Sequence, residues 1–104
     1  MSEVFRSKKL RDSARDQPCG NCGSVGTTIS AHVRSVAFGS GTGIKAPDFY
    51  IAYLCEPCHA LVDGRAGRLT REEQMEIWTR AYFRTVAHWF NSGLVVVSKG
   101  RLTW

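Results

Sequence analysis

The sequence predicts a small α+β domain that is stabilised by zinc and covered by a long C-terminal helix. All four cysteines of the 104-residue chain fall in two C-x2-C pairs, Cys19/Cys22 and Cys55/Cys58, and this spacing is typical of zinc sites. The chain between the two pairs is rich in β-forming residues, and residues 70–92 carry apolar side chains at helical spacing. At this length we expect one domain, in which zinc binding would supply folding free energy on the order of 10 kcal/mol.

The predicted domain spans residues 1–104 and opens with a basic segment in residues 1–17. The run from Arg6 to Arg11 favours a short helix that reaches about Asp16. Two interpretations of this segment stay open. It is either a solvated, frayed arm or an arm that contacts phosphates.

Residues 18–66 are expected to form a zinc-clamped core. In chain order we expect a zinc turn over 18–23, a strand over 27–33, a glycine-rich loop over 39–47, a strand over 49–54 and a short helix from Pro57 to Gly64. β-branched and aromatic side chains favour the two strands, and proline suits the first turn of a helix. The loop lacks the Walker spacing, so it is no evidence for nucleotide binding. It either lets the backbone approach a phosphate or only connects the strands.

The C-terminal helix is predicted over residues 70–92. Thr70 and Glu73 form a capping box at its start, and Gly93 suits its end. One apolar stripe runs along it, and we expect that stripe to face the core rather than a ligand: Met75, Trp78, Tyr82, Thr85 and Trp89, widened by Ala81, Val86 and Phe90. His88 is expected to be structural or exposed. Residues 94–97 predict a final short strand, and Trp104 has no assigned role.

The charge balance favours a polyanionic partner. The formal net charge is +5 and the pI is about 9.3, which suits nucleic acid, although an ordinary solvated basic surface has the same composition. The N-terminus carries no apolar signal sequence, and no stretch is long enough to span a membrane. We therefore expect a cytoplasmic protein, in which paired cysteines bind metal more often than they form disulfides or act in redox chemistry.

Two histidines and an aspartate define a candidate active site. His32 is expected at the end of the first strand, and His59 and Asp63 on the following helix. The i, i+4 spacing of the last two puts them on one helical face, as ligands of one divalent metal require. His32 would then face them across the junction between strand and helix.

This ordered set of motifs resembles the HNH nucleases, also called ββα-metal or His-Me finger nucleases. Many members carry a C-x2-C pair, a histidine at a strand end, and a second pair followed at once by histidine. The chain is most similar to the small nuclease-like proteins of lambdoid phages and prophages. That similarity is carried by the segments Ala31–Arg34, Gly41–Asp48 and Cys55–Arg65.

The resemblance implies a metal-dependent DNA endonuclease that acts in phage recombination, repair or DNA processing in the cytoplasm of a bacterial host. His32 would be the general base, since histidine titrates near working pH. His59 and Asp63 would hold Mg²⁺ or Mn²⁺, and the four cysteines a structural Zn²⁺. Phosphates would be contacted by three further residues, namely Arg34, Lys45 and Arg65.

The sequence departs from the HNH pattern at two positions. Ala31 stands where many members have an acidic metal ligand, and the asparagine that orients the base is missing. Asp48 is the nearest polar residue at that place. It would either orient His32 by accepting the Nδ1–H or only cap a turn. Two other functions therefore stay open, a non-catalytic zinc-ribbon-like DNA-binding module and a protein-interaction adaptor that uses zinc only for stability.

Overall fold

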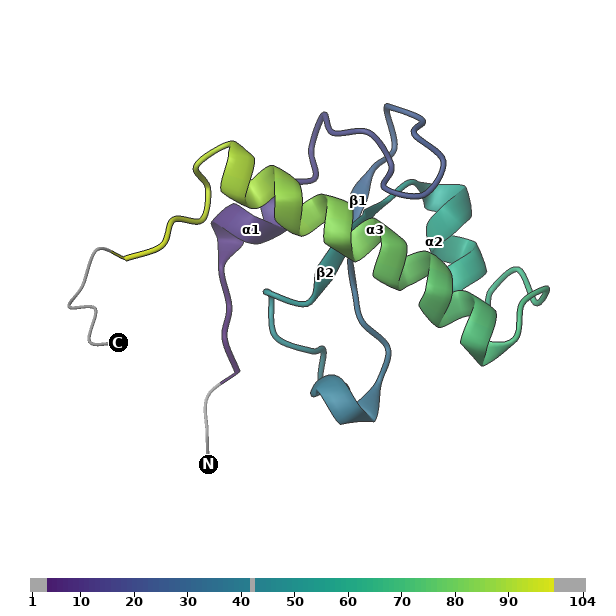
Figure 1. Ribbon diagram of the computed structural model, residues 1–104. Coiled ribbons are helices and arrows are strands. Elements are labelled where there is room, and N and C mark those ends of the chain that lie inside the picture. The colour runs from purple at the N-terminus through teal and green to yellow at the C-terminus, as the bar shows by residue number, and fades with distance from the viewer. Residues whose placement is uncertain (1–3, 42, 99–104) are drawn as a thin grey trace.

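The computed structural model describes residues 4–41 and 43–98. The described elements are α1 (Lys8–Asp12), β1 (Ile29–His32), the 3-10 helix η1 (Val36–Phe38), β2 (Ile51–Leu54), α2 (Glu56–Val62) and α3 (Arg71–Asn91). This order confirms a small α+β fold with a two-stranded sheet and a C-terminal helix (Figure 1). No helix within the described ranges combines the length and the apolar character that crossing a membrane requires.

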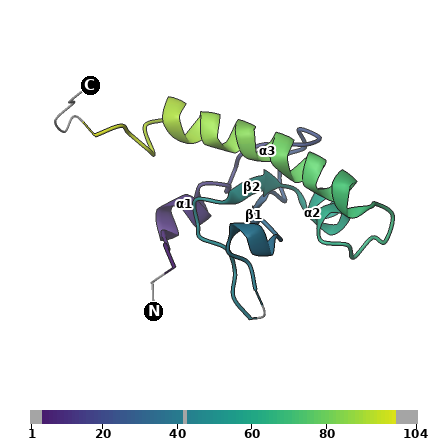
Figure 2. The ribbon, with the colours of Figure 1, turned by 60° about the horizontal axis from the view of Figure 1, so that its bottom comes forward.

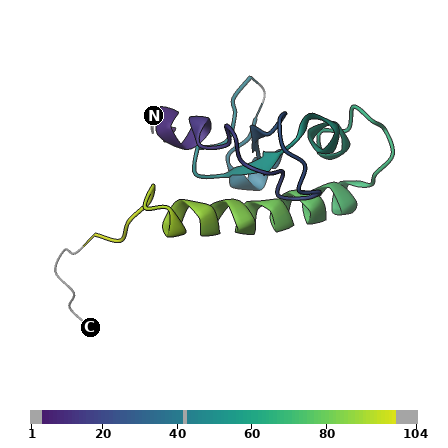
Figure 3. The ribbon, with the colours of Figure 1, turned by 90° about the horizontal axis from the view of Figure 1, so that it is seen from above.

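The two strands pair antiparallel and are covered on one side by α3. Ile29 pairs with Leu54 and His32 with Ile51. Helix α3 lies along one side of the molecule, with α1, the sheet and α2 on its other side (Figure 3). The connection that contains η1 follows the end of β1 and lies below the strands in Figures 1 and 2.

All four residues of β2 are buried because both of its sides meet a core. Side chains alternate along a strand. Ala52 and Leu54 join one cluster, which includes Trp78 and the cysteines Cys19, Cys55 and Cys58. Ile51 and Tyr53 join a second cluster with Leu10, Ala14 and Trp89. The strand that leads into the second cysteine pair is thus fixed on both sides.

Helix α3 begins as its capping box predicts. The Thr70 hydroxyl accepts from the Glu73 amide at 3.1 Å, and the Glu73 carboxylate accepts from the Thr70 amide at 2.8 Å. Trp78, Ala81, Thr85 and Trp89 of the predicted stripe are buried. The assignment of Phe90 to this stripe was wrong, because this residue is 49% exposed. As the residue directly after Trp89, it points in a different direction around the helix from that buried side chain.

The close approach of α3 to the first zinc turn explains why residue 20 is a glycine. A Cβ at Gly20 would lie 2.8 Å from the Cα and the Cβ of Ala81. This is shorter than real contacts, so any larger residue would push the turn off the helix. The Arg84 guanidinium also donates to the Gly20 carbonyl at 2.8 Å. The helix thereby positions the first cysteine pair.

The expected elements differ from the structure mainly at their ends. The strand predicted over 94–97 is absent: Leu94 and Val95 pack near Trp89, whereas Val96 and Val97 are 74% and 80% exposed. Valine-rich composition favours a strand only where a sheet edge is available to pair with.

Four other elements are shorter than predicted. Helix α1 ends at Asp12 rather than Asp16, since the Ser13 hydroxyl donates to the Leu10 carbonyl and Asp16 has a φ of 67°. The strands begin at Ile29 and Ile51, later than expected, and Asp63 is the C-cap of α2 rather than a residue within it. Trp104 lies outside the described residues.

Candidate functional site

The four cysteines converge as the sequence predicts. The Sγ atoms of Cys19, Cys22, Cys55 and Cys58 all lie within 4.8 Å of one another, and Cys22 Sγ and Cys55 Sγ are 3.6 Å apart. Tetrahedral zinc with Zn–S bonds of about 2.3 Å sets its sulfurs about 3.8 Å apart. The cluster therefore fits a metal ion such as zinc, held between the turn at 18–23 and the start of α2.

Hydrogen bonds prepare the sulfurs of this cluster for a cation. The amides of Asn21 and Cys22 donate to Cys19 Sγ at 3.3 and 3.4 Å, and the Asn21 side chain donates to Cys58 Sγ at 3.3 Å. Contacts from Ser24 lower the pKa of Cys22 to about 6. Burial raises the pKa of Cys58 to about 12. The buried Cys58 thiolate thus depends on a bound cation, as in a metal site that stabilises a fold.

A second site lies in an open cavity of about 770 Å³. His32 at the end of β1 lines it, together with His59 of α2 and Asp63, the C-cap of that helix. The glycine-rich loop supplies another wall through Gly41, Gly43, Ile44 and Lys45. The fold thus brings the three predicted active-site residues to one cavity.

The ligand atoms of His59 and Asp63 lie close enough together to reach one metal ion. His59 Nε2 lies 3.8 Å from Asp63 Oδ2. Two ligands at about 2.1 Å from one ion can be at most about 4.2 Å apart, so this separation fits. In the described part of the chain, the cysteines are the only group of three or more possible ligands within 4.8 Å of one another. His32 therefore stands apart from the pair, and the pair alone would leave most coordination positions to water and substrate.

Arg65 donates hydrogen bonds to both carboxylate oxygens of Asp63. Its Nε donates to Asp63 Oδ2 at 2.7 Å, and its amide donates to Asp63 Oδ1 at 3.0 Å. A further nitrogen of Arg65 lies 3.3 Å from His59 Nδ1. Burial would raise the pKa of Asp63, but these contacts from Arg65 outweigh it and hold the pKa below its usual range. The carboxylate is kept ionised, as a metal ligand must be.

The other predicted phosphate contacts line the same cavity. Arg34 donates to the carbonyl of Asp63, which ties β1 to the end of α2. The Lys45 side chain is exposed and has no polar partner among the described residues. Both cations, with Arg65, give the cavity a positive rim.

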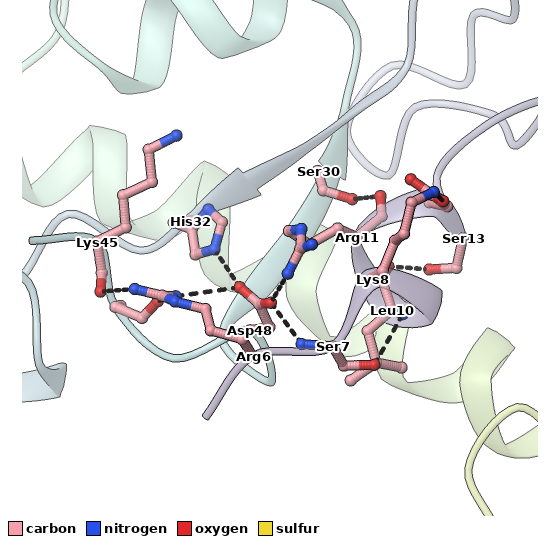
Figure 4. A network of polar contacts seen from close by, with 12 residues as sticks. Arg6, Ser7, Lys8, Leu10, Arg11, Ser13, Ser30, His32, Lys45 and Asp48 are labelled. Atoms are coloured by element: carbon pink, nitrogen blue, oxygen red, sulfur yellow. Dashed lines mark hydrogen bonds and ion pairs between the residues drawn. The ribbon is translucent and has the colours of Figure 1, made fainter. Parts of the chain in front are cut away.

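Asp48 orients His32 from beneath the cavity. Its side chain is fully buried, and Oδ1 lies 2.7 Å from His32 Nε2 (Figure 4). Burial would raise the pKa of Asp48, but hydrogen bonds from His32, the Ser7 amide, Arg11 and Arg6 hold it well below its usual range. The carboxylate can only accept, so in the neutral imidazole Nε2 carries the proton. The expectation that Asp48 would accept from Nδ1 was wrong, and Nδ1 is left with its lone pair.

The partners of Asp48 come from a segment that sequence reasoning had left open. The Arg6 guanidinium donates to Asp48 Oδ1 at 3.1 Å, and Ser7 and Arg11 donate to Oδ2. The basic segment is therefore docked against the site rather than frayed. Its run of basic residues was the available signal, but Asp48, about 40 residues away, could not be recognised as its partner.

Ala31 cannot replace the missing acidic ligand. Its side chain is 2% exposed and packs in the core cluster with Leu54 and Trp78. The Trp78 indole donates to the Ala31 carbonyl at 2.8 Å. The residue before His32 thus anchors β1 to α3.

The comparisons with known proteins point to one family. The family model described as Putative nuclease YbcO matches residues 8–94. No curated protein and no solved structure matches this chain. The matched segment contains both cysteine pairs, His32, and the elements that line the cavity.

Proposed function

We propose, from the premise that this chain belongs to the Putative nuclease YbcO family, that it is a metal-dependent DNA endonuclease with an HNH-type, ββα-metal site. Its role would be in phage DNA recombination, repair or processing. The observation that carries the proposal is the shared cavity. There His32 offers an Nδ1 that has no partner among the described residues, in the same cavity as His59 and Asp63, whose ligand atoms are 3.8 Å apart.

His32 is the general base of the proposed reaction. Its Nε2–H is held by Asp48, so Nδ1 is free to take a proton from the water that attacks the phosphorus. The ionised Asp48 also stabilises the imidazolium that this transfer forms. Because Asp48 is fully buried and held by the basic segment, the ring keeps one orientation.

His59 and Asp63 would hold the catalytic divalent metal, and the oxygen ligand and the open positions suit Mg²⁺ or Mn²⁺. When bound, such an ion supplies positive charge for the pentavalent transition state and the leaving oxygen. In this proposal the scissile phosphate would lie between the end of α2 and His32. The four cysteines would bind zinc with a purely structural role.

Arg34, Lys45 and Arg65 would contact phosphates around the cavity rim. Contacts of this kind give affinity without sequence preference. Arg65 would also keep Asp63 ionised until a metal takes the place of the guanidinium at the carboxylate.

Nicking of supercoiled plasmid tests the proposal. Wild-type protein is expected to nick with Mg²⁺ or Mn²⁺, and His32→Ala to lose nicking while keeping its zinc content and melting temperature. Cobalt and nickel are included because metal preference differs between sites. If no metal supports nicking but both proteins bind DNA equally, the chain is a non-catalytic zinc-ribbon-like DNA-binding module and the endonuclease proposal fails. If neither binds DNA at low salt, an adaptor role replaces both.

A further inference from the structure

A second cavity, of about 660 Å³, adjoins the first. Arg6, Arg11 and Asp48 line it, and none of these three lines the first cavity. His32 and the loop residues Gly43, Ile44 and Lys45 line both. The two cavities therefore meet at His32 and this loop, and only the first contains the proposed metal ligands.

The second cavity carries an excess of positive charge. Three cationic side chains line it, from Arg6, Arg11 and Lys45, against the single carboxylate of Asp48. That carboxylate is fully buried and each of its oxygens already accepts two hydrogen bonds. The Arg6 and Arg11 side chains are 41% and 40% exposed. Solvent thus meets the cations, while the anion is hidden beneath them.

Each cation has donors to spare. Arg11 uses only Nη1, on Asp48, among the contacts of the described residues. Arg6 uses Nη1 for Asp48 and the Ala46 carbonyl and Nη2 for the Lys45 carbonyl, which leaves Nε–H and one Nη2–H. The Lys45 ammonium extends past His32, away from Asp48 (Figure 4). Two guanidinium groups fixed at one end, with free N–H groups at the other, are suited to a tetrahedral oxyanion.

We propose that Arg6, Arg11 and Lys45 bind the backbone phosphate adjacent to the scissile one. This rests on the proposed function, because it requires the scissile phosphate to lie in the first cavity. A nucleic acid strand would then cross His32, with one phosphate near His59 and Asp63 and the next over the two arginines. The same arginines hold Asp48, so the contacts that fix the substrate also fix the base.

Salt-dependent DNA binding tests this second phosphate site. All variants are made in the His32→Ala background, which prevents cleavage, and fluorescence anisotropy measures binding of a short labelled duplex between 50 and 200 mM NaCl. Each phosphate contact contributes about 0.9 to the slope of log K against log salt concentration. Arg11→Gln and Lys45→Gln are each expected to lower the slope by about that amount. Lys9→Gln is the matched control, since it removes the same charge from an exposed residue of α1 that lines neither cavity.

Protection of arginines by DNA gives a second readout that needs no substitution in the basic segment. An arginine-specific reagent followed by peptide mass spectrometry is expected to show that the duplex protects Arg6 and Arg11. The control is Arg68, which is exposed and lines neither cavity. This decides the matter if Arg11→Gln fails to fold.

The outcomes separate the two proposals. Two results would overturn the second phosphate site while the endonuclease proposal stands. In the first, DNA binds but the salt slope of Arg11→Gln equals that of Lys9→Gln. In the second, DNA lowers the reactivity of Arg6 and Arg11 no more than that of Arg68. If the parent protein binds no DNA at 50 mM NaCl, the proposed function itself is overturned. A lower slope together with arginine protection supports the site.

Discussion

The cysteine cluster and the His59–Asp63 pair differ in how much of a metal's coordination the fold supplies. Two rigid turns bring four sulfurs within 4.8 Å of one another, and three of the four cysteines are buried. The second site offers two side chains, 28% and 16% exposed, beside a cavity of about 770 Å³. In the absence of a metal, a guanidinium holds its carboxylate.

This difference matches the two uses that proteins make of metals. A closed site with four protein ligands contributes its binding free energy to folding, whereas an open site keeps positions for water and substrate. The cysteines would therefore stabilise the fold, and the His59–Asp63 pair would act in catalysis. Each prediction below changes one region and asks whether the other is affected.

The largest effect is expected in the cysteine cluster. Cys58→Ser replaces a buried ligand and would remove most of a binding free energy on the order of 10 kcal/mol. We expect loss of zinc and of cooperative unfolding, measured by elemental analysis and circular dichroism. Ser24→Ala, beside the cluster, should keep its zinc. A Cys58→Ser protein that melts like wild type would show that zinc is not needed for the fold.

The next effect should be confined to the cavity. His32→Ala is expected to slow DNA cleavage by roughly 10²- to 10⁴-fold, the usual contribution of a general base, without loss of zinc. His88→Gln is the matched control, since His88 contacts Tyr53 in the second core cluster rather than the cavity. Equal cleavage rates for His32→Ala and wild type would exclude His32 as the base.

A smaller effect links the cavity to stability through Asp48. Its pKa is depressed in the folded protein, so its stabilisation is present above the unfolded pKa and is lost as the pH falls through the folded value. Asp48→Asn should therefore lower the free energy of unfolding by about 1–3 kcal/mol at pH 7. Urea denaturation should show the difference from wild type shrinking steadily below about pH 4. A difference that stays constant down to pH 2 would contradict the ionised carboxylate.

The smallest effect concerns Arg65, which competes with a metal for Asp63. Exposed ion pairs contribute about 0.2–1 kcal/mol, so Arg65→Gln should tighten Mn²⁺ binding by roughly 1.4- to fivefold. Titration followed by electron paramagnetic resonance measures this, with Arg68→Gln as the control for lost charge. Unchanged or weaker Mn²⁺ binding in Arg65→Gln would show that Arg65 does not occupy the metal position.

Local sequence signals predicted much of this fold. The C-x2-C turns, the Thr70–Glu73 capping box and the stripe from Trp78 to Trp89 each depend on residues a few positions apart, and the structure contains all of them. The strand predicted over 94–97 failed because β propensity cannot reveal whether a sheet edge is free.

Long-range contacts set the limit for the site. His32, His59 and Asp63 could be grouped from motif order, and Asp48 was singled out as the polar residue nearest to the place of the missing asparagine. Which imidazole nitrogen Asp48 holds, and that Arg6 and Arg11 hold Asp48, depends on contacts between residues 16 to 42 positions apart. No local pattern encodes that pairing.

The most direct test of two metals with two roles is plasmid nicking by zinc-loaded protein as Mn²⁺ is added, with Asp63→Asn beside wild type. We predict no nicking with zinc alone, nicking that rises with Mn²⁺ in wild type, and a large loss in Asp63→Asn at an unchanged content of one zinc per chain. Nicking that needs no added metal, or that is equal in Asp63→Asn, would contradict the division of roles between the two sites.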